Sequence, residues 1–109
     1  MRAALDDAGI GPDEVGYVNL HGTGTQANDE MEMRAVGRVF GTSPRAKVES
    51  TKNLTGHCLG AAGAVEAAIC WLLLESGCVE GAAMSNSFAF GGANASVVFG
   101  KEGAWAKTL

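Results

Sequence analysis

Basic residues are scarce in this sequence and never form a run. The 109 residues include 8 lysines and arginines against 12 aspartates and glutamates, which gives a formal net charge of −4. Proteins that bind nucleic acid or an anionic membrane surface concentrate positive charge on one face or segment. The sequence therefore predicts neither a nucleic acid nor a membrane as a partner.

Cysteines and long apolar segments are also scarce. Three cysteines, an odd number without Cys-x-x-Cys spacing, do not suggest a disulfide framework. The longest nearly uncharged run, residues 60–74, contains Glu66 and is too short to cross a bilayer. The chain opens with an amphipathic run and not with a basic-then-apolar signal segment. We expect a soluble, reduced, cytoplasmic protein.

The composition is that of one modest globular domain. Hydrophobic residues make up 47% of the chain, and its 16 glycines follow no period, which excludes collagen and linker structures. Turn residues and apolar periodicity predict a helix, a strand, a helix, a strand, a helix and two strands. These cover residues 1–8, 15–20, 28–40, 47–50, 58–75, 81–87 and 95–99. The order is typical of an α/β fold.

Two of the expected helices carry specific predictions. In the helix over 28–40, which begins at Asn28 or Asp29, Met33, Val36 and Phe40 are spaced to form one buried face. The helix over 58–75 is apolar nearly all round, so it requires cover on every side. A glycine turn over 88–92 joins the last two strands.

The first candidate site is the loop from His21 to Thr25, directly after a strand, where α/β folds commonly bind ligands. Thr23 and Thr25 offer hydroxyls to an amide-rich ligand, although ordinary turn chemistry would also explain them. The Gly22-x-Gly24 pair lacks the third glycine of a dinucleotide site and the lysine of a P-loop. A nucleotide ligand is therefore not expected.

The second candidate site surrounds His57. His57 directly precedes the apolar helix predicted from Cys58, and the positive end of the helix dipole disfavours an imidazolium there. Two neutral histidines meeting one carbonyl would stabilise an enolate or oxyanion. A buried structural histidine is the alternative. Glu66 is the only charge in its helix before Glu75 at the end, and it requires a partner, for which Lys52 is nearest in sequence. That pair is equally compatible with a structural role.

The cysteines give a further alternative. Cys58 adjoins His57, but neighbouring helical residues do not face one another, and Cys70 lies among core positions. Zinc is not expected, because the histidines and cysteines lack ligand spacing. A self-contained cysteine–histidine hydrolase remains open; it predicts thioesterase turnover that Cys58→Ser abolishes.

Three motifs together resemble the β-ketoacyl synthases, the elongating condensing enzymes of fatty-acid and polyketide synthesis. They are His21-Gly-Thr-Gly-Thr25, Lys52-x-x-x-x-His57 with Gly60-Ala-Ala-Gly63, and Asn86-Ser-Phe-Ala-Phe-Gly-Gly-x-Asn94. The resemblance covers nearly all of the chain but only the C-terminal part of the family's catalytic unit. It implies residues 1–109 as one domain, the C-terminal half of a thiolase-like fold, with a mixed sheet and a buried central helix.

The resemblance also implies a decarboxylative Claisen condensation between an acyl thioester and malonyl-acyl carrier protein. His21 and His57 match the catalytic histidines, and Lys52 with Glu66 the pair that supports them. The other matches are Thr23 and Thr25 for the phosphopantetheine arm, the Phe88 N–H as an oxyanion donor, and Phe90 as a gate. No tightly bound cofactor is implied except a structural monovalent cation, with ligands at Asn19, Glu32, Glu66, Ser85 and Asn94, all oxygen donors.

The resemblance implies partners as well: acyl carrier protein, the N-terminal half that is absent here, and a second copy in a homodimer. None of the three cysteines lies in the family's nucleophile motif, so we expect the chain alone to be inactive. Without the other half, the apolar helix should leave a large apolar face exposed and the fragment unstable. Ala89 replaces the usual glycine, which should stiffen the gate. A non-catalytic partner subunit resembling a chain length factor is the alternative; both histidines and Lys52 argue against it.

Overall fold

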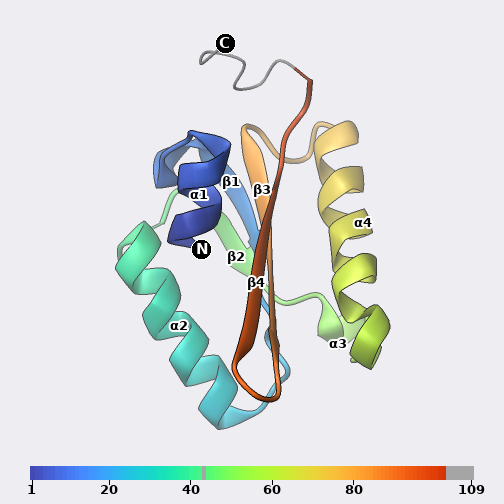
Figure 1. The fold of residues 1–109 in the computed structure, drawn as a ribbon. Coiled ribbons are helices and arrows are strands. Elements are labelled where there is room, and N and C mark those ends of the chain that lie inside the picture. The colour runs from blue at the N-terminus through green and yellow to red at the C-terminus, as the bar shows by residue number, and fades with distance from the viewer. Residues whose placement is uncertain (43, 103–109) are drawn as a thin grey trace.

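The computed structural model describes residues 1–42 and 44–102. Its sheet has the order β2-β1-β3-β4, with β1 parallel to β2 and β3, and β4 antiparallel to β3. Helices α1 and α2 lie on one face of the sheet and α4 on the other (Figure 1). The predicted mixed α/β fold is confirmed. The elements are α1 Arg2–Ala8, η1 Pro12–Glu14, β1 Val15–Asn19, α2 Gln26–Phe40, β2 Lys47–Glu49, α3 Lys52–Thr55, η2 Leu59–Ala61, α4 Ala62–Glu75, β3 Ala82–Ala89 and β4 Ala93–Phe99.

Strand β1 lies between two parallel neighbours and is buried on both faces. All of its residues except Gly16 are buried, so burial does not alternate along the strand. Parallel strands covered on both faces are generally apolar throughout. A β-carbon at Gly16 would lie 2.1 Å from the carbonyl oxygen of Glu80, so only glycine allows this close approach.

The sheet separates two apolar clusters. The cluster under α1 and α2 includes Leu5, Val15, Val18 and Met84. The cluster under α4 consists of Tyr17, Cys70, Leu74 and Ala83. Among the residues that the structure describes, no helix has the length and apolar character that a bilayer crossing requires.

Helix α2 differs from its prediction at its start and in its buried face. It begins at Gln26 with Thr25 as the N-cap residue, earlier than predicted. Glu32 and Val36 are its buried residues, whereas Met33 is 51% exposed, so the predicted burial of Met33 is wrong. The helix turns Glu32 inward because this carboxylate accepts backbone hydrogen bonds from the loop after β1.

The predicted helix over 58–75 is also wrong at its start, since α4 begins only at Ala62. The backbone between α3 and α4 is interrupted by positive φ angles at Gly56 (74°) and Leu59 (50°), a conformation that does not continue a right-handed helix. His57 therefore lies in an irregular segment. The argument from the helix dipole does not apply to it.

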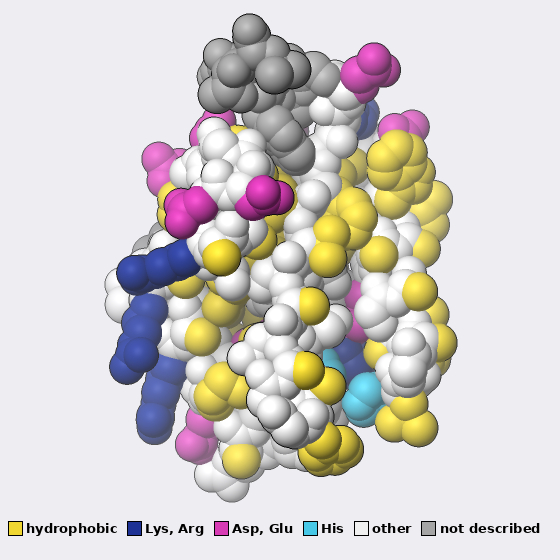
Figure 2. Space-filling view, viewed as in Figure 1, with side chains coloured by type: hydrophobic (Ala, Val, Ile, Leu, Met, Phe, Trp, Pro, Cys, Tyr) yellow, Lys and Arg dark blue, Asp and Glu magenta, His cyan; other side chains and the backbone are white. Residues whose placement is uncertain are grey.

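Helix α4 is covered on one side only in this chain. Its buried residues, Ala62, Glu66, Cys70 and Leu74, are four apart and form one stripe against the sheet. On its other side Trp71 is 51% and Leu72 64% exposed, and Figure 2 shows hydrophobic side chains gathered over α4. The predicted exposure of a large apolar face is confirmed.

Strands β3 and β4 form a hairpin with a shorter turn than the predicted one over 88–92. Phe88 and Ala89 are the last residues of β3, and Ala89 pairs with Ala93. The positive φ angles of the turn fall on Gly91 and Gly92. Alanine is therefore compatible with the backbone at position 89.

Candidate active site

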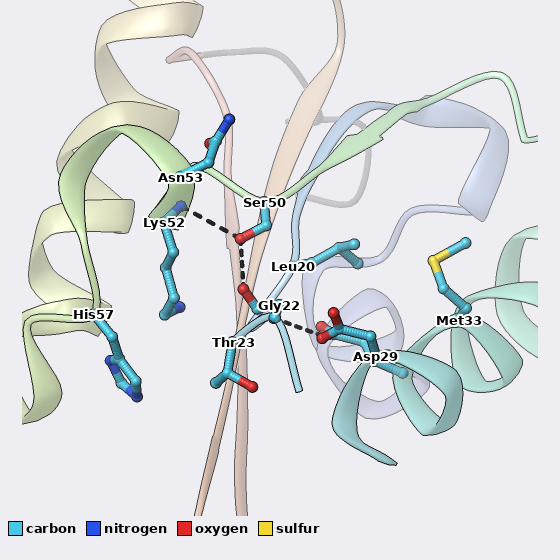
Figure 3. A pocket seen from close by; sticks show the side chains of 11 residues that line it. Leu20, Gly22, Thr23, Asp29, Met33, Ser50, Lys52, Asn53 and His57 are labelled. Atoms are coloured by element: carbon cyan, nitrogen blue, oxygen red, sulfur yellow. Dashed lines mark hydrogen bonds between the residues drawn. The ribbon is translucent and has the colours of Figure 1, made fainter. Parts of the chain in front are cut away.

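The carboxyl ends of β1, β2 and β3 meet at one edge of the sheet, as they must when strands are parallel. There the loop after β1 and the segment after β2 enclose a cleft of about 510 Å³. Figure 3 shows Lys52 and His57 on one wall, Asp29 and Met33 on the other, and Gly22 and Ser50 between them. The lining is Leu20, Gly22, Thr23, Gly24, Asp29, Glu32, Met33, Ser50, Lys52, Asn53 and His57.

The two histidines come together beside this cleft. Their ring centroids are 5.7 Å apart, with an angle of 88° between the ring planes. The ring of His21 also makes an edge-type contact with the ring of Phe88, with the centroids 5.6 Å apart and an angle of 66° between the ring planes. His21 thus lies between His57 and Phe88, whereas His57 lines the cleft itself.

The hydrogen bond of one ring and the burial of the other bear on where their protons lie. The Nδ1 atom of His57 accepts the N–H of Leu59 at 3.2 Å, so the proton of the neutral ring is on Nε2. The pKa of His21 is lowered, first by burial and then by the positive charges of Lys52 and His57. Neutral imidazole at His21 is therefore the form expected near pH 7. Its Nδ1 is buried without a hydrogen-bond partner.

The ion pair expected between Lys52 and Glu66 is present. The Nζ of Lys52 contacts the Oε1 of Glu66, and the two residues are only 8% and 1% exposed. The pair joins the start of α3 to the second turn of α4, and both of its charges act on His21. Because both charges are removed from water, each is stabilised mainly by the opposite charge of its partner.

Glu32 fixes the backbone of the loop that carries His21. Its fully buried carboxylate accepts the N–H of His21 at 2.7 Å and that of Gly22 at 2.8 Å. Burial raises the pKa of Glu32, and these two hydrogen bonds oppose the rise. From the other side, the Ser50 hydroxyl donates to the Gly22 carbonyl at 2.8 Å.

The sequence did not predict this role for Glu32 or Ser50. A charged residue four positions before the buried Val36 was the available signal for Glu32. The approach of Ser50 to Gly22 had no such signal. A β-carbon at Gly22 would lie 2.5 Å from that of Ser50, so glycine is required there.

The other predicted substrate-binding residues, Thr23, Thr25, Phe88 and Phe90, do not all lie at the cleft. The hydroxyls of Thr23 and Thr25 are 3.0 Å apart, and Thr23 lines the cleft. Phe88 lies within β3 against His21. Phe90 is fully exposed near the tip of the hairpin, away from the cleft lining.

The proposed cation ligands fall into two groups. Asn19 and Ser85 are paired across β1 and β3, and their side-chain oxygens are buried without partners, as is Oε2 of Glu66. Both oxygens of Glu32 already accept backbone N–H groups. Asn94 is exposed and pairs with Phe88, so it is not brought to the others. Within residues 1–42 and 44–102, no three histidines, cysteines or acids are grouped as a metal site.

The cysteines do not form a catalytic pair with His57. The exposed Cys58 thiol contacts the carbonyls of Thr55 and Gly56, at 3.7 and 3.9 Å. The His57 ring instead accepts the Leu59 N–H. Burial raises the pKa of Cys70 to about 11, so its thiol is inert near neutral pH.

Comparisons with known proteins agree with this geometry. The family described as "Beta-ketoacyl synthase, C-terminal domain" matches residues 1–85. Nodulation protein E of Rhizobium leguminosarum bv. trifolii is 41% identical over 125 residues, covering 91% of this chain and 31% of that protein. The 3-oxoacyl-[acyl-carrier-protein] synthase 2 of Coxiella burnetii is 40% identical over 128 residues, covering 93% and 31%.

Solved structures give the same result. A chain of the ketosynthase–chain length factor complex from Xenorhabdus doucetiae matches with a TM-score of 0.84 and 42% identity, over 92% of this chain and 32% of that one. A chain of the ishigamide ketosynthase/chain length factor matches with a TM-score of 0.85 and 35% identity, over 92% and 31%. The predicted thiolase-like fold is confirmed. This chain spans about a third of the length of these relatives.

Proposed function

This chain belongs to the β-ketoacyl synthase family, and on that premise we propose that it supplies the histidine pair of a decarboxylating condensing enzyme. The substrates would be an acyl thioester and a malonyl thioester on acyl carrier protein, in fatty-acid or polyketide synthesis. The observation that carries the proposal is the edge-to-face approach of two histidine rings, 5.7 Å apart, beside an open cleft.

The histidines act on the oxygen of the malonyl thioester. As the bond to the carboxylate breaks and carbon dioxide leaves, the electron pair moves into an enolate whose oxygen gains negative charge. The Nε2–H of His57 donates to that oxygen, and neutral His21 donates beside it. The enolate carbon then forms the new bond to the acyl carbonyl carbon, and a cysteine thiolate leaves from it.

The other residues position these two rings. Glu66 holds the Lys52 ammonium in place, and the positive charge of Lys52 favours neutral His21. Thr23 and Thr25 hold the phosphopantetheine arm through their hydroxyls. Phe88 contacts His21 and offers its backbone N–H to an oxyanion. Phe90, exposed at the hairpin and outside the cleft lining, would act as a gate only after the hairpin moves toward the cleft.

We take none of the three cysteines of this chain as the one that carries the acyl group, because the thiols of Cys58 and Cys70 bond to backbone carbonyls and Cys78 lies beyond the end of α4. We place the acyl-carrying cysteine in the part of the relatives' length that this chain does not span. The chain alone is then inactive and acts with that part. A homodimer, acyl carrier protein as partner and a cytoplasmic location belong to the same proposal.

A structural monovalent cation fits part of the implied ligand set. Asn19, Glu66 and Ser85 each have a buried side-chain oxygen without a hydrogen-bond partner, and Asn19 and Ser85 are paired across β1 and β3. A cation that these oxygens hold would remove the cost of leaving them unpaired. Bound there, it would balance the second oxygen of Glu66. The test is thermal unfolding in sodium, potassium or choline chloride at equal ionic strength. Ser85→Ala should abolish any difference, and identical melting in all three salts would contradict the site.

A partner subunit resembling a chain length factor is the second candidate. Both structural matches come from complexes of a ketosynthase with a chain length factor, which favours this alternative. The paired histidines and the buried Lys52 oppose it, since a subunit without catalysis has no need of either. Condensing activity decides between the two.

The decisive experiment makes a chimera in which this chain replaces the last third of a relative, such as the Coxiella enzyme, and follows the first two-thirds of that relative. The chimera should release carbon dioxide from malonyl-acyl carrier protein and form the condensed product. His57→Ala should reduce decarboxylation by a factor of about 100 or more. Cys58→Ser is the matched control next to it and should leave both rates unchanged.

Two outcomes would count against condensation. Undiminished decarboxylation in His57→Ala would remove the role assigned to the histidine. A folded chimera without activity that still binds an active ketosynthase would favour the partner-subunit alternative. Thioester hydrolysis lost in Cys58→Ser would favour the hydrolase.

A further inference from the structure

Two polar groups on the face of the sheet that α4 covers, the hydroxyl of Tyr17 and the carboxylate of Glu49, have no role in the proposed condensation. Tyr17 belongs to the apolar cluster under α4. Asn19 lies two residues further along β1 and therefore on the same face. The partner of Asn19 in β2 is Glu49, and its partner in β3 is Ser85. These residues form one polar group at the carboxyl ends of the parallel strands.

A series of hydrogen bonds connects these side chains. The hydroxyl of Tyr17 donates to Oε1 of Glu49 at 3.2 Å, and Nδ2 of Asn19 donates to the Tyr17 oxygen at 3.4 Å. The same Nδ2 donates to Oγ1 of Thr51 at 3.1 Å. Tyr17, Asn19 and Thr51 are all buried. The series therefore ties β1 to β2 and to the segment after it from inside the fold.

The carboxylate of Glu49 fixes the direction of this series. Glu49 pairs with Lys47 at 3.1 Å, and an ionised carboxylate only accepts hydrogen bonds. A phenol has one proton to donate, and it goes to Glu49 because a charged acceptor binds it more strongly than a neutral amide oxygen does. The Tyr17 oxygen then only accepts, so it selects the NH2 group of Asn19 and not the carboxamide oxygen.

This orientation leaves the carboxamide oxygen of Asn19 turned away from Tyr17 and Thr51. Strand β2 lies on one side of β1 and β3 on the other. In the described part of the chain, nothing hydrogen-bonds the buried Oδ1 of Asn19, the Oγ of Ser85 or the Oε2 of Glu66. A carboxamide turned the other way would present N–H donors in place of the oxygen that a hard cation prefers. The donor set of the proposed cation therefore depends on the orientation of Asn19.

We propose that Tyr17, held by Glu49, is a positioning residue that presents the carboxamide oxygen of Asn19 to the structural cation. Tyr17 acts through Asn19 and is not itself a ligand. Groups that orient the ligands of a metal ion in this way change its affinity by about 10- to 100-fold. The inference rests on the cation site of the proposed function and is separate from the role of the two histidines.

The test measures how much sodium or potassium chloride gives half of the maximal rise in melting temperature, with choline chloride keeping the ionic strength equal. Tyr17→Phe keeps the ring and removes the hydroxyl, so the half-maximal concentration should rise by about tenfold or more. Glu49→Gln can donate an N–H to the Tyr17 oxygen, which frees the phenol proton for the oxygen of Asn19. This second variant should therefore weaken the cation as well.

Ser96→Ala is the matched control. The Ser96 hydroxyl donates to Oδ1 of the buried Asn86 at 2.7 Å, so this variant also releases a buried carboxamide from a hydroxyl, outside the proposed ligand set. It should lower the melting temperature in every salt and leave the half-maximal concentration unchanged.

Three results would overturn the inference. They are an unchanged half-maximal concentration in Tyr17→Phe, a rise in Ser96→Ala equal to that in Tyr17→Phe, and no stabilisation of the unmodified chain by either salt. The last result would remove the cation site as well. Condensation by the chimera and its loss in His57→Ala are measured independently, so a failure here is distinguishable from a failure of the proposed condensation.

Discussion

Removing either partner of the Lys52–Glu66 ion pair should strongly destabilise this chain. Lys52→Met leaves a carboxylate with 1% exposure and no counter-ion, and Glu66→Gln leaves an ammonium at 8% exposure. Breaking a buried pair from one side costs about 3–5 kcal/mol, because the remaining charge stays desolvated. A domain of this size is generally stable by only about 5–15 kcal/mol, so either variant should lose a large part of its stability.

The surface pair Lys47–Glu49 is the matched control. Its atoms are 3.1 Å apart, and its side chains are 70% and 37% exposed. Water and salt screen such a pair, so Lys47→Met should change the free energy of unfolding by less than about 1 kcal/mol. Removing both buried charges, in Lys52→Met with Glu66→Leu, should recover most of the stability lost in either single variant.

Urea denaturation followed by circular dichroism measures all four variants. The exposed side of α4 makes self-association a concern, so the midpoints should agree at two protein concentrations. If Lys52→Met costs no more than Lys47→Met, the pair is solvated in solution and its proposed role at His21 is wrong. A double variant less stable than either single one would show that the charges stabilise the fold outright.

Three further predictions concern separate features. In an NMR titration the pKa of His21 should lie below 6.5. Because the folded state then binds the proton more weakly than the unfolded state, the stability due to neutral His21 is complete above pH 6.5 and is lost as the pH falls through the folded-state pKa. Lys52→Met should raise that pKa, and an unchanged value would contradict the assigned cause. Glu32→Gln leaves one good acceptor for two N–H groups, so amide exchange at His21 and Gly22 should accelerate while that of β4 does not. Leu72→Lys should reduce self-association in sedimentation velocity, whereas Leu54→Lys, a control outside α4 that is even more exposed (82% against 64%), should reduce it less.

Local sequence determined most of the elements. Gly9 ends α1 in the left-handed conformation, and the apolar runs form β1 and β3 close to their predicted bounds. The errors fall where a long-range contact overrides local preference. Met33 has the right spacing to be buried, but Glu32 takes the inward position because the loop after β1 supplies its two N–H donors.

In the candidate site, too, the sequence predicted the residues but not the contacts that set their state. The residue types and their motifs identified both histidines, Lys52 and Glu66 from the sequence alone. The helix-dipole argument for His57 was wrong, because the helix starts at Ala62. The tautomer depends instead on the N–H of Leu59, a residue in the left-handed region that no local preference would place there.

The sequence by itself thus determined the chemical groups and the class of fold, because periodicity and turn residues act over a few neighbours. Only the tertiary structure decided which groups meet. It paired Lys52 with Glu66 across 14 residues and brought His21 to His57. It also left Asn94 and Phe90 outside the site. These contacts depend on where the parallel strands end and how the helices cross them, which no local pattern specifies.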